Sequence, residues 1–206
     1  MGRRLTVYFS LLSPWAYIGH AELRRLAGKH DLAVEYCPVD LMEVFPETGG
    51  LPLSKRHPSR QAYRLLELRR WREKRGLCFH LWPRFWPFDP ALADRVVCAL
   101  VAGNADPQKF IAGAFAAIFE QNRNLADTHE VAAVLGENGY HPSWLARAGA
   151  PETAALYRDN RTRALAEGVF GSPSYVLDGE IFWGQDRLDL LDDALTSGRA
   201  AFTVAE

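Results

Sequence analysis

The stretch LTVYFSLLSPWAYIG, residues 5–19, places a strand directly before the start of a helix. Residues 5–12 form an apolar, aromatic and β-branched run of strand length. Ser13 and Pro14 follow at once, and helices favour these residue types as the N-cap and as the first helical position. The stretch therefore predicts a buried strand that leads straight into a helix N-terminus, with one hydroxyl at the junction.

Two interpretations of Ser13 follow from this stretch alone. In the first, Ser13 only caps the helix, which is a common role for serine before proline. In the second, Ser13 is a functional hydroxyl, because the free N–H groups and the dipole of a helix start also favour a bound anion. The choice between them depends on the rest of the chain.

The residues that follow extend the strand into an α/β pattern. Residues 15–29 have a partial apolar face and a basic end, which predicts a helix. Residues 32–39 (LAVEYCPV) predict a second strand, and Pro38 marks a strand end or an edge strand. A right-handed crossover through the helix makes the two strands parallel.

The middle of the chain, residues 41 to about 150, is predicted to be helical throughout most of its length. Residues 40–58 are rich in Pro and Gly without a clear period, whereas residues 59–75 predict a strong helix that Gly76 ends. Asp127 and Glu130 form a capping box for a later helix. Other helices are expected at residues 89–102, 106–121, 142–148 and 151–167.

An aromatic, proline-rich connector, LWPRFWPFDP, occupies residues 81–90. Its prolines exclude a regular helix, so its large side chains need another place to pack. They either fill the core or line an apolar pocket, and both interpretations stand. If they line a pocket, the residues expected to contact an organic substrate are Trp15, Trp82, Phe85 and Trp86.

The end of the chain returns to strand patterns. Residues 174–177 and 180–183 flank Asp178-Gly179, a dipeptide that favours a two-residue hairpin turn. Residues 187–196 predict a last helix that Gly198 ends. The predicted order is βαβ, a helical block, then αββα. We expect one domain from residues 1–40 and 150–206, and an inserted helical domain at residues 41–149.

Composition and charge exclude several classes of partner. The chain has 206 residues and a formal net charge of -1, which gives no overall electrostatic case for nucleic acid. The arginine-rich face of residues 59–75 has no known nucleic-acid-reading motif, so a solvated face is expected there. No run of about 18 apolar residues indicates a membrane span. We therefore expect neither nucleic-acid nor membrane partners.

Cysteine and histidine usage argues against disulfides and metal. The cysteines Cys37, Cys78 and Cys98 are scattered and form no C-x-x-C pair, so each is expected to be a small buried hydrophobe. The six histidines include no H-x-x-x-H or H-E-x-x-H pair. The sequence predicts a cytoplasmic protein without a metal site.

The order of elements, an α/β thioredoxin-like fold (βαβ … αββα) with a large all-helical insertion, leads to a family resemblance. SPWAYIG stands where thioredoxin-like disulfide enzymes keep their C-x-x-C, and residues 168–191 (GVFGSPSYVLDGEIFWGQDRLDLL) stand where they keep a proline loop, a hairpin and a final helix. Together these blocks resemble the 2-hydroxychromene-2-carboxylate isomerase family. That family is similar to kappa-class glutathione transferases and is related to bacterial periplasmic disulfide oxidoreductases.

The resemblance implies glutathione as cofactor and a set of residues that bind it. Ser13 matches the catalytic serine, and Pro173 matches a cis-proline. Ser172 matches the residue whose backbone pairs with the cysteinyl part of glutathione. Gln185 and Asp186 match the pair that holds the γ-glutamyl end, although Asp186 has the alternative role of helix cap. The resemblance also implies a homodimer.

The chain departs from the family pattern in two places, one pair of residues and one single residue. The family's Asn-Lys pair, which meets the glycyl carboxylate and other parts of glutathione, is Ser59-Arg60 here. Arginine keeps the charge of lysine but changes the geometry. Ser10 stands where family members often have Asp. Both departures suggest a substrate that differs from that of the family's named members.

The resemblance implies cis–trans isomerisation of an unsaturated aromatic keto acid. In that reaction glutathione thiolate adds to a double bond, rotation follows, and elimination returns the thiol. The alternatives are a glutathione transferase or peroxidase on the same site, and a non-catalytic interaction domain that docks through residues 60–75. A disulfide oxidoreductase is disfavoured because residues 13–16 contain no cysteine.

Overall fold

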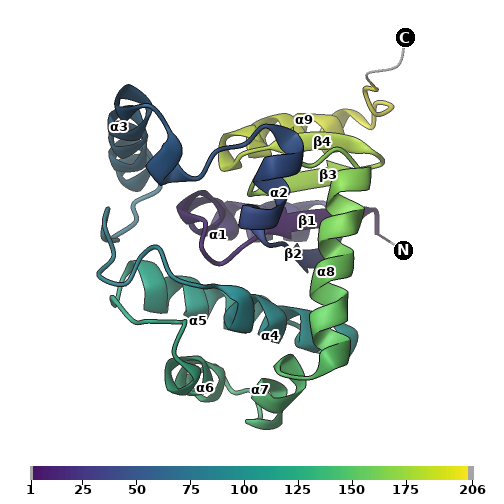
Figure 1. Ribbon diagram of the computed structural model, residues 1–206. Helices are drawn as coiled ribbons and strands as arrows, with labels where there is room; N and C mark the ends of the chain where they lie inside the picture. The colour runs from purple at the N-terminus through teal and green to yellow at the C-terminus, as the bar shows by residue number, and fades with distance from the viewer. Residues whose placement is uncertain (1, 204–206) are drawn as a thin grey trace.

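The computed structural model describes residues 2–203, which form a four-stranded sheet surrounded by helices (Figure 1). The strands are β1 (Arg4–Phe9), β2 (Ala33–Pro38), β3 (Ser174–Leu177) and β4 (Glu180–Trp183), in the order β2-β1-β3-β4. The predicted parallel pairing of β1 and β2 is confirmed, with Leu5 opposite Val34. β3 pairs antiparallel with both β1 and β4.

The two faces of the sheet pack against different helices. Alternate residues of β1, namely Leu5, Val7 and Phe9, belong to the larger core, which also takes in α1 (Pro14–Lys29) and α9 (Leu188–Ser197). Tyr8 points to the other face, into a smaller core with residues of α2 (Leu41–Thr48) and α8 (Pro151–Ala166). This alternation is the period of two that a strand buried on both faces requires.

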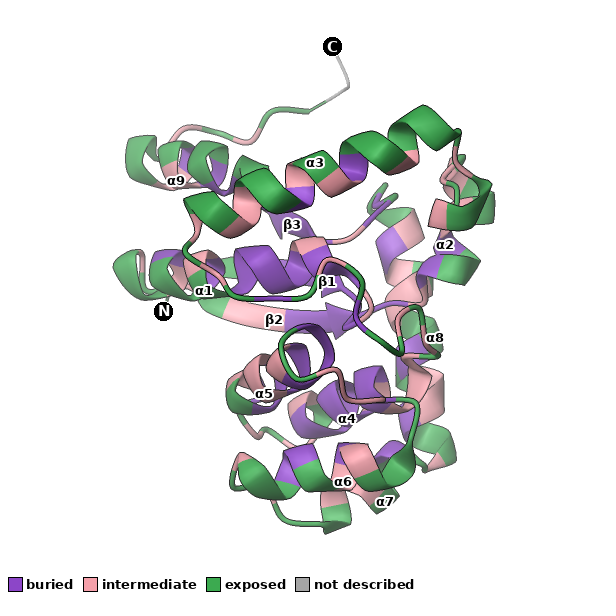
Figure 2. Ribbon diagram, turned by 90° about the vertical axis from the view of Figure 1, so that its left-hand side faces the viewer, coloured by how far each residue is buried: buried purple, intermediate pink, exposed green. Residues whose placement is uncertain are grey.

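The helical block lies between β2 and β3 in the chain. Its helices are α2, α3 (Pro58–Lys74), α4 (Ala91–Ala102), α5 (Gln108–Phe119), α6 (Thr128–Glu137) and α7 (Ser143–Ala148), with a 3₁₀ turn η1 at Leu53–Lys55. α4 and α5 share the larger core with β1 and α1, so hydrophobic packing is continuous from the sheet into the block. α3 differs from them, because most of its surface is exposed (Figure 2).

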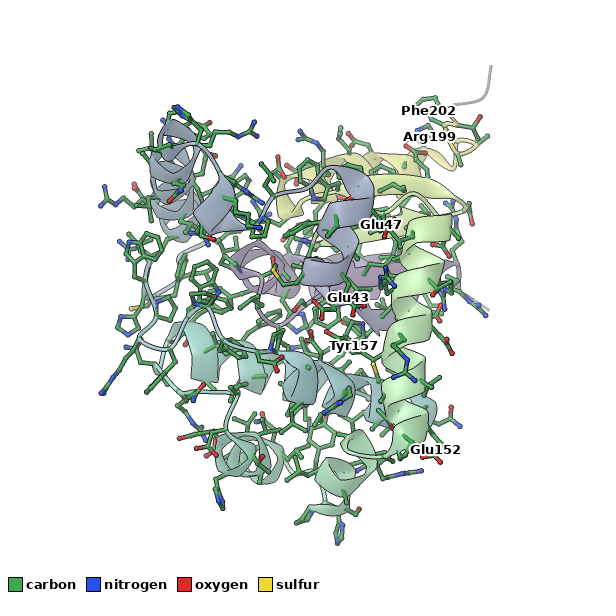
Figure 3. The ribbon with its side chains drawn as sticks, in the orientation of Figure 1. Glu43, Glu47, Glu152, Tyr157, Arg199 and Phe202 are labelled. Atoms are coloured by element: carbon green, nitrogen blue, oxygen red, sulfur yellow. The ribbon has the colours of Figure 1, made fainter. Side chains whose placement is uncertain are left out.

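α8 connects the block to the sheet. Its Arg161 forms ion pairs with Glu43 and Glu47 of α2, at 3.5 and 3.7 Å, on the side of the molecule shown in Figure 3. Its Arg163 donates two hydrogen bonds to Glu35 of β2, at 2.7 and 3.0 Å. These contacts hold α8 across the smaller core.

Three local expectations are corrected by the structure. Residues 41–48 form α2, which Asp40 caps by accepting a hydrogen bond from the Met42 N–H at 2.8 Å. Cys78 is exposed in the segment without regular secondary structure after α3, whereas Cys37 and Cys98 are buried as expected. The last helical segment begins as a 3₁₀ turn, η2 (Gln185–Arg187), before α9 starts.

Within residues 2–203, no helix is both long and apolar enough to cross a membrane. The same residues contain no group of three or more His, Cys, Asp or Glu side chains arranged to hold a metal ion.

Candidate active site

Ser13 lies at the junction of β1 and α1 and is 5% exposed. Its hydroxyl caps α1 by accepting a hydrogen bond from the Ala16 N–H at 3.2 Å, as the Ser-Pro signal predicts. The same hydroxyl donates to the backbone carbonyl of Ser172 at 3.2 Å. Ser13 therefore joins a helix start to a loop that is 159 residues later in the chain.

The loop before β3 is fixed by bonds on both sides. The Ser172–Pro173 peptide is cis, as the resemblance implies. The Ser172 hydroxyl accepts a hydrogen bond from the Ser10 N–H at 3.2 Å. The carbonyl of Pro173 accepts from the Gly184 N–H at 2.9 Å, which ties the loop to the end of β4.

Gln185 reaches the same region from η2. It is 2% exposed, and its Oε1 is buried without a hydrogen-bond partner among the described residues. It packs against α1 at Gly19, where an added Cβ would lie 2.6 Å from the Cβ of Gln185. Asp186 is exposed beside it and forms an ion pair with Arg187 at 3.0 Å. Ser13, Ser172, Pro173 and Gln185 thus gather around the first turns of α1.

A buried carboxylate supports the loop that leads to Ser13. Asp94 of α4 is fully buried and accepts hydrogen bonds from the Leu11 N–H at 2.9 Å, the Ser10 hydroxyl at 2.8 Å and the Tyr157 hydroxyl at 3.1 Å. Tyr157 is a buried residue of α8 and is labelled in Figure 3. Burial raises the pKa of Asp94 to about 7, although the three donors oppose the rise.

Asp94 was not identified from the sequence. The signal that marks it is the single acidic residue of α4, ALADRVVCALVA, in which Arg95 is the one other charged residue. A carboxylate in such a helix is buried only where donors reach it. No spacing rule links those donors to Asp94, because they lie 84, 83 and 63 positions away.

Ser59 and Arg60 lie apart from this cluster. Both are exposed in the first turn of α3, where the Ser59 hydroxyl is 2.7 Å from Nδ1 of His57. Among the described residues, no hydrogen bond or ion pair joins either of them to Ser13 or Ser172. The structure therefore brings the predicted serine, cis-proline and glutamine together, and leaves the predicted pair of α3 on the surface.

One part of the aromatic connector packs against the core, another part is exposed, and its predicted role as a pocket lining stays a prediction. The indole N–H of Trp86 donates to the carbonyl of Leu12 at 2.8 Å, one residue before Ser13. Trp86 and Phe88 pack against the larger core, as does Trp15, whereas Trp82 and Phe85 are 56% and 40% exposed. The rings of Trp82 and Trp86 are 6.2 Å apart. Trp86 is therefore the aromatic residue with a direct bond to the loop that carries Ser13.

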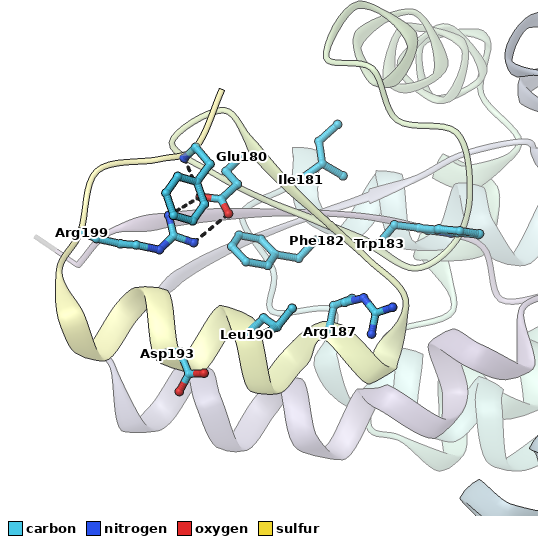
Figure 4. Close-up of a pocket in the computed structure, with 9 residues that line it drawn as sticks. Glu180, Ile181, Phe182, Trp183, Arg187, Leu190, Asp193 and Arg199 are labelled. Atoms are coloured by element: carbon cyan, nitrogen blue, oxygen red, sulfur yellow. Dashed lines mark hydrogen bonds and ion pairs between the residues drawn. The ribbon is translucent and has the colours of Figure 1, made fainter. Parts of the chain in front are cut away.

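The cavity drawn in Figure 4 lies elsewhere. It measures about 410 Å³ and is lined by β4, α9 and the segment after α9, including Trp183, Leu190 and Phe202. Arg199 spans one side of it by donating to both carboxylate oxygens of Glu180 at 2.7 and 2.8 Å. Ser13 does not line this cavity. The candidate active site is thus defined by hydrogen-bonding geometry at the start of α1, and not by that cavity.

A family model for the DSBA-like thioredoxin domain matches residues 4–196, which is nearly the whole chain. The chain belongs to the DSBA-like thioredoxin domain family. The sheet order, the cis-proline before β3 and the helix that starts immediately after β1 agree with the thioredoxin-like fold predicted from the sequence. This member has Ser13 at the start of that helix, and no cysteine at residues 13–16.

Curated relatives of this DSBA-like chain carry a common name. It is 29% identical over 198 residues to a 2-hydroxychromene-2-carboxylate isomerase of Sphingobium xenophagum, covering 95% of this chain and 99% of the relative. A Pseudomonas putida protein of the same name is 27% identical over 192 residues, covering 91% and 92%. A solved 2-hydroxychromene-2-carboxylate isomerase structure superposes with a TM-score of 0.79 at 22% identity, covering 94% of this chain and 95% of that one.

Proposed function

We propose that this protein is a glutathione-dependent cis–trans isomerase of an unsaturated aromatic keto acid, similar to 2-hydroxychromene-2-carboxylate isomerases. The observation that carries the proposal is the position of Ser13, whose hydroxyl lies at the start of α1 and 3.2 Å from the carbonyl before Pro173. The names of relatives that match almost the full chain support the same reaction.

The residues around Ser13 fit a glutathione molecule in three respects. The buried Oε1 of Gln185 has no partner, and it suits an N–H donor such as the ammonium group of the γ-glutamyl end. The exposed carboxylate of Asp186 lies next in the chain and carries the opposite charge to that ammonium. The backbone of Ser172 suits the cysteinyl part, because its carbonyl faces the hydroxyl of Ser13.

Ser13 and the helix start favour the ionised form of a thiol. A free thiol has a pKa of about 8.5 and is mostly protonated at neutral pH. A hydroxyl donor and the positive end of a helix each stabilise an anion by about 0.5–2 kcal/mol, which lowers a thiol pKa by roughly one to two units in total. Ser13 is therefore a hydrogen-bond donor in this proposal and not a nucleophile.

The hydrogen bond from the Ser13 hydroxyl to the Ser172 carbonyl is one that a bound ligand could replace. The Ser172 carbonyl would accept from a backbone N–H of glutathione in place of the Ser13 hydroxyl. The Ser13 hydroxyl, which also accepts from the Ala16 N–H, would then be available to donate to the thiol that glutathione supplies. Bound glutathione supplies a thiol that adds reversibly to a double bond and leaves after rotation, so no conjugate accumulates.

The test is a calorimetric titration of reduced glutathione into the wild type, Ser13→Ala and Ser143→Ala. Ser143 provides the control because it is an exposed serine at the start of α7, far from Ser13 in the chain. We expect saturable binding by the wild type and the control, with thiolate absorbance near neutral pH that only Ser13→Ala loses. No binding at about 10 mM glutathione would refute the proposal and favour an interaction domain.

Product analysis then separates the isomerase from a transferase on the same site. An isomerase returns glutathione in full, whereas a transferase forms a stable conjugate and a peroxidase oxidises glutathione. A homodimer remains part of the proposal, and light scattering of the purified protein measures it.

A further inference from the structure

Arg64 of α3 is a buried cation without an anionic partner. It is 9% exposed, and its Nη1 is buried without a hydrogen-bond partner. Among residues 2–203, no Asp or Glu forms an ion pair with it. Burial lowers the pKa of Arg64 to about 10, and the neighbouring charge of Arg56 adds to the effect. A guanidinium that is removed from water in this way is ordinarily paired with a carboxylate or a phosphate.

Arg64 is distinguished from the exposed arginines of α3, such as Arg60 and Arg69, because it is buried. Arg70 forms an ion pair with Glu67, and Arg75 forms one with Glu22 of α1 at 3.4 Å. Arg70 is exposed and needs no compensation for burial, but the largely buried Arg75 has an acidic partner and the buried Arg64 has none among the described residues.

The position of Arg64 relates it to the candidate active site. Its Cζ lies 4.9 Å from the ring centroid of Trp86, a cation–π contact that holds the guanidinium over the indole. The indole N–H of Trp86 in turn donates to the carbonyl of Leu12 at 2.8 Å. Two contacts thus connect the unpaired guanidinium to the residue that precedes Ser13.

We propose that Arg64, oriented by Trp86, binds a carboxylate of a molecule held at the Ser13 site. The planar fork of a guanidinium accommodates a carboxylate through two parallel hydrogen bonds. The proposal rests on the proposed function, and the proposed reaction offers two sources of the carboxylate. One source is the keto acid substrate, and the other is the glycyl end of glutathione.

The experiment compares each acid with its ester by calorimetric titration into the full chain. One pair is 2-hydroxycinnamate and its methyl ester, and the other is glutathione and its glycyl monoethyl ester. The proteins are wild type, Arg64→Gln, Arg64→Lys and Arg69→Gln. Arg69 provides the control because it is exposed on the same helix.

We expect the wild type and Arg69→Gln to bind the acid about tenfold more tightly than the ester in one of the two pairs. Arg64→Gln loses that preference, and Arg64→Lys, which keeps the charge without the fork, retains part of it. Loss in the cinnamate pair identifies the substrate as the source of the carboxylate, and loss in the glutathione pair identifies the glycyl end.

Three results would overturn the assignment of Arg64. They are equal binding of acid and ester by the wild type in both pairs, an unchanged preference in Arg64→Gln, and a fall in the Tm of Arg64→Gln by more than about 5 °C. The last would make Arg64 a structural residue, since removal of an unpaired buried charge is expected to leave the Tm unchanged or raise it. If the wild type prefers the acid to the ester through Arg64 but catalyses no isomerisation, the proposed function is rejected and the assignment of Arg64 stands.

Discussion

The two sides of the candidate site are built differently. On the sheet side, Ser13, Ser172 and Gln185 are held by bonds and packing between segments far apart in the chain. On the α3 side, the predicted contact residue Arg60 is exposed, and helix α3 presents mostly exposed residues (Figure 2). In the proposed function, Ser13 and its neighbours therefore belong to the buried part of the fold, whereas the predicted contact of Arg60 with glutathione belongs to a helix that is mostly exposed.

This difference indicates where the chain tolerates change. A substitution on the sheet side disturbs bonds that also support the core, so its effect on stability and on activity is coupled. A substitution on α3 alters charge and shape at an exposed surface, where most changes cost little stability. The departures at Ser59 and Arg60 fall on the α3 side, whereas the departure at Ser10 falls on the sheet side, where its hydroxyl donates to the carboxylate of Asp94.

The largest effect is expected from Asp94→Ala on the sheet side. The change leaves the N–H of Leu11 and the hydroxyls of Ser10 and Tyr157 without their acceptor. We expect the free energy of unfolding to fall by about 2–4 kcal/mol. Urea denaturation measures the loss, with Arg69→Gln on α3 expected to stay within about 0.5 kcal/mol of wild type. Equal stability of the two variants would contradict the comparison.

The second effect is on catalysis. Ser13→Ala is expected to lower kcat/KM for isomerisation about 10–100-fold, because the donor to the thiolate is lost. It also removes a helix cap, which costs about 1 kcal/mol of stability. Asp127 caps α6 in the same way, because its carboxylate accepts from the His129 N–H at 2.8 Å. Asp127→Ala is therefore a control for the loss of a helix cap. Similar kinetics for both variants would reduce Ser13 to a cap.

The third prediction concerns pH and two buried groups with opposite signs. Burial lowers the pKa of His20 to about 4. Between that value and the ordinary histidine pKa of about 6.5, the unfolded chain binds a proton that the folded chain does not, so stability falls as pH drops through this range. Burial raises the pKa of Asp94 to about 7, so unfolding releases a proton and stability falls as pH rises from about 4 to 7.

Between pH 4 and 6.5 these slopes oppose each other at about 1 kcal/mol per pH unit. We expect His20→Phe to become less stable as pH rises in this window, and Asp94→Asn to become more stable. Thermal unfolding at half-unit intervals measures both slopes, and the double variant is expected to keep only the slope of carboxylates with a lowered pKa, such as Glu35, whose stabilisation is lost as pH falls. Parallel curves for the two single variants would show that neither side chain titrates as described.

The smallest effect is expected on the α3 side, for the predicted contact of Arg60 with glutathione. Because Arg60 is exposed, salt screens its attraction for a carboxylate. Arg60→Ala is expected to raise the Kd for glutathione about two- to fivefold at low ionic strength and less than twofold at about 0.5 M salt. An unchanged Kd at low ionic strength would remove Arg60 from the glutathione site.

Local signals in the sequence predicted much of the fold. The hairpin at Ser174–Leu177 and Glu180–Trp183 was placed to the residue because Asp178-Gly179 permits the positive φ values, 51° and 87°, that its turn adopts. The cap at Ser13 was visible for a similar reason. Both features are determined by neighbours in the chain, which is the information that a single sequence carries.

The missed features depend on tertiary contacts. Helix α2 contains Pro46, which argues against a helix locally, but packing of Leu41 and Val44 in the smaller core stabilises it. The hydrogen-bond partners of Asp94 are dispersed over the chain. Arg64 lacks an acidic partner among the described residues, and no sequence motif predicts such an absence. The family resemblance placed Ser172 and Gln185 next to Ser13, and periodicity alone would not have done so. The boundaries at residues 40 and 150 remain a prediction.

The strand order has a consequence for the time course of synthesis. β1 lies between β2 and β3, yet about 165 residues separate Phe9 from Ser174. At roughly 5–20 residues per second, one hydrogen-bonding edge of β1 waits on the order of ten to thirty seconds for its partner to leave the ribosome. An unpaired apolar edge is a site where nascent chains aggregate. We therefore expect chaperones to contact this segment early, and the active site to form last.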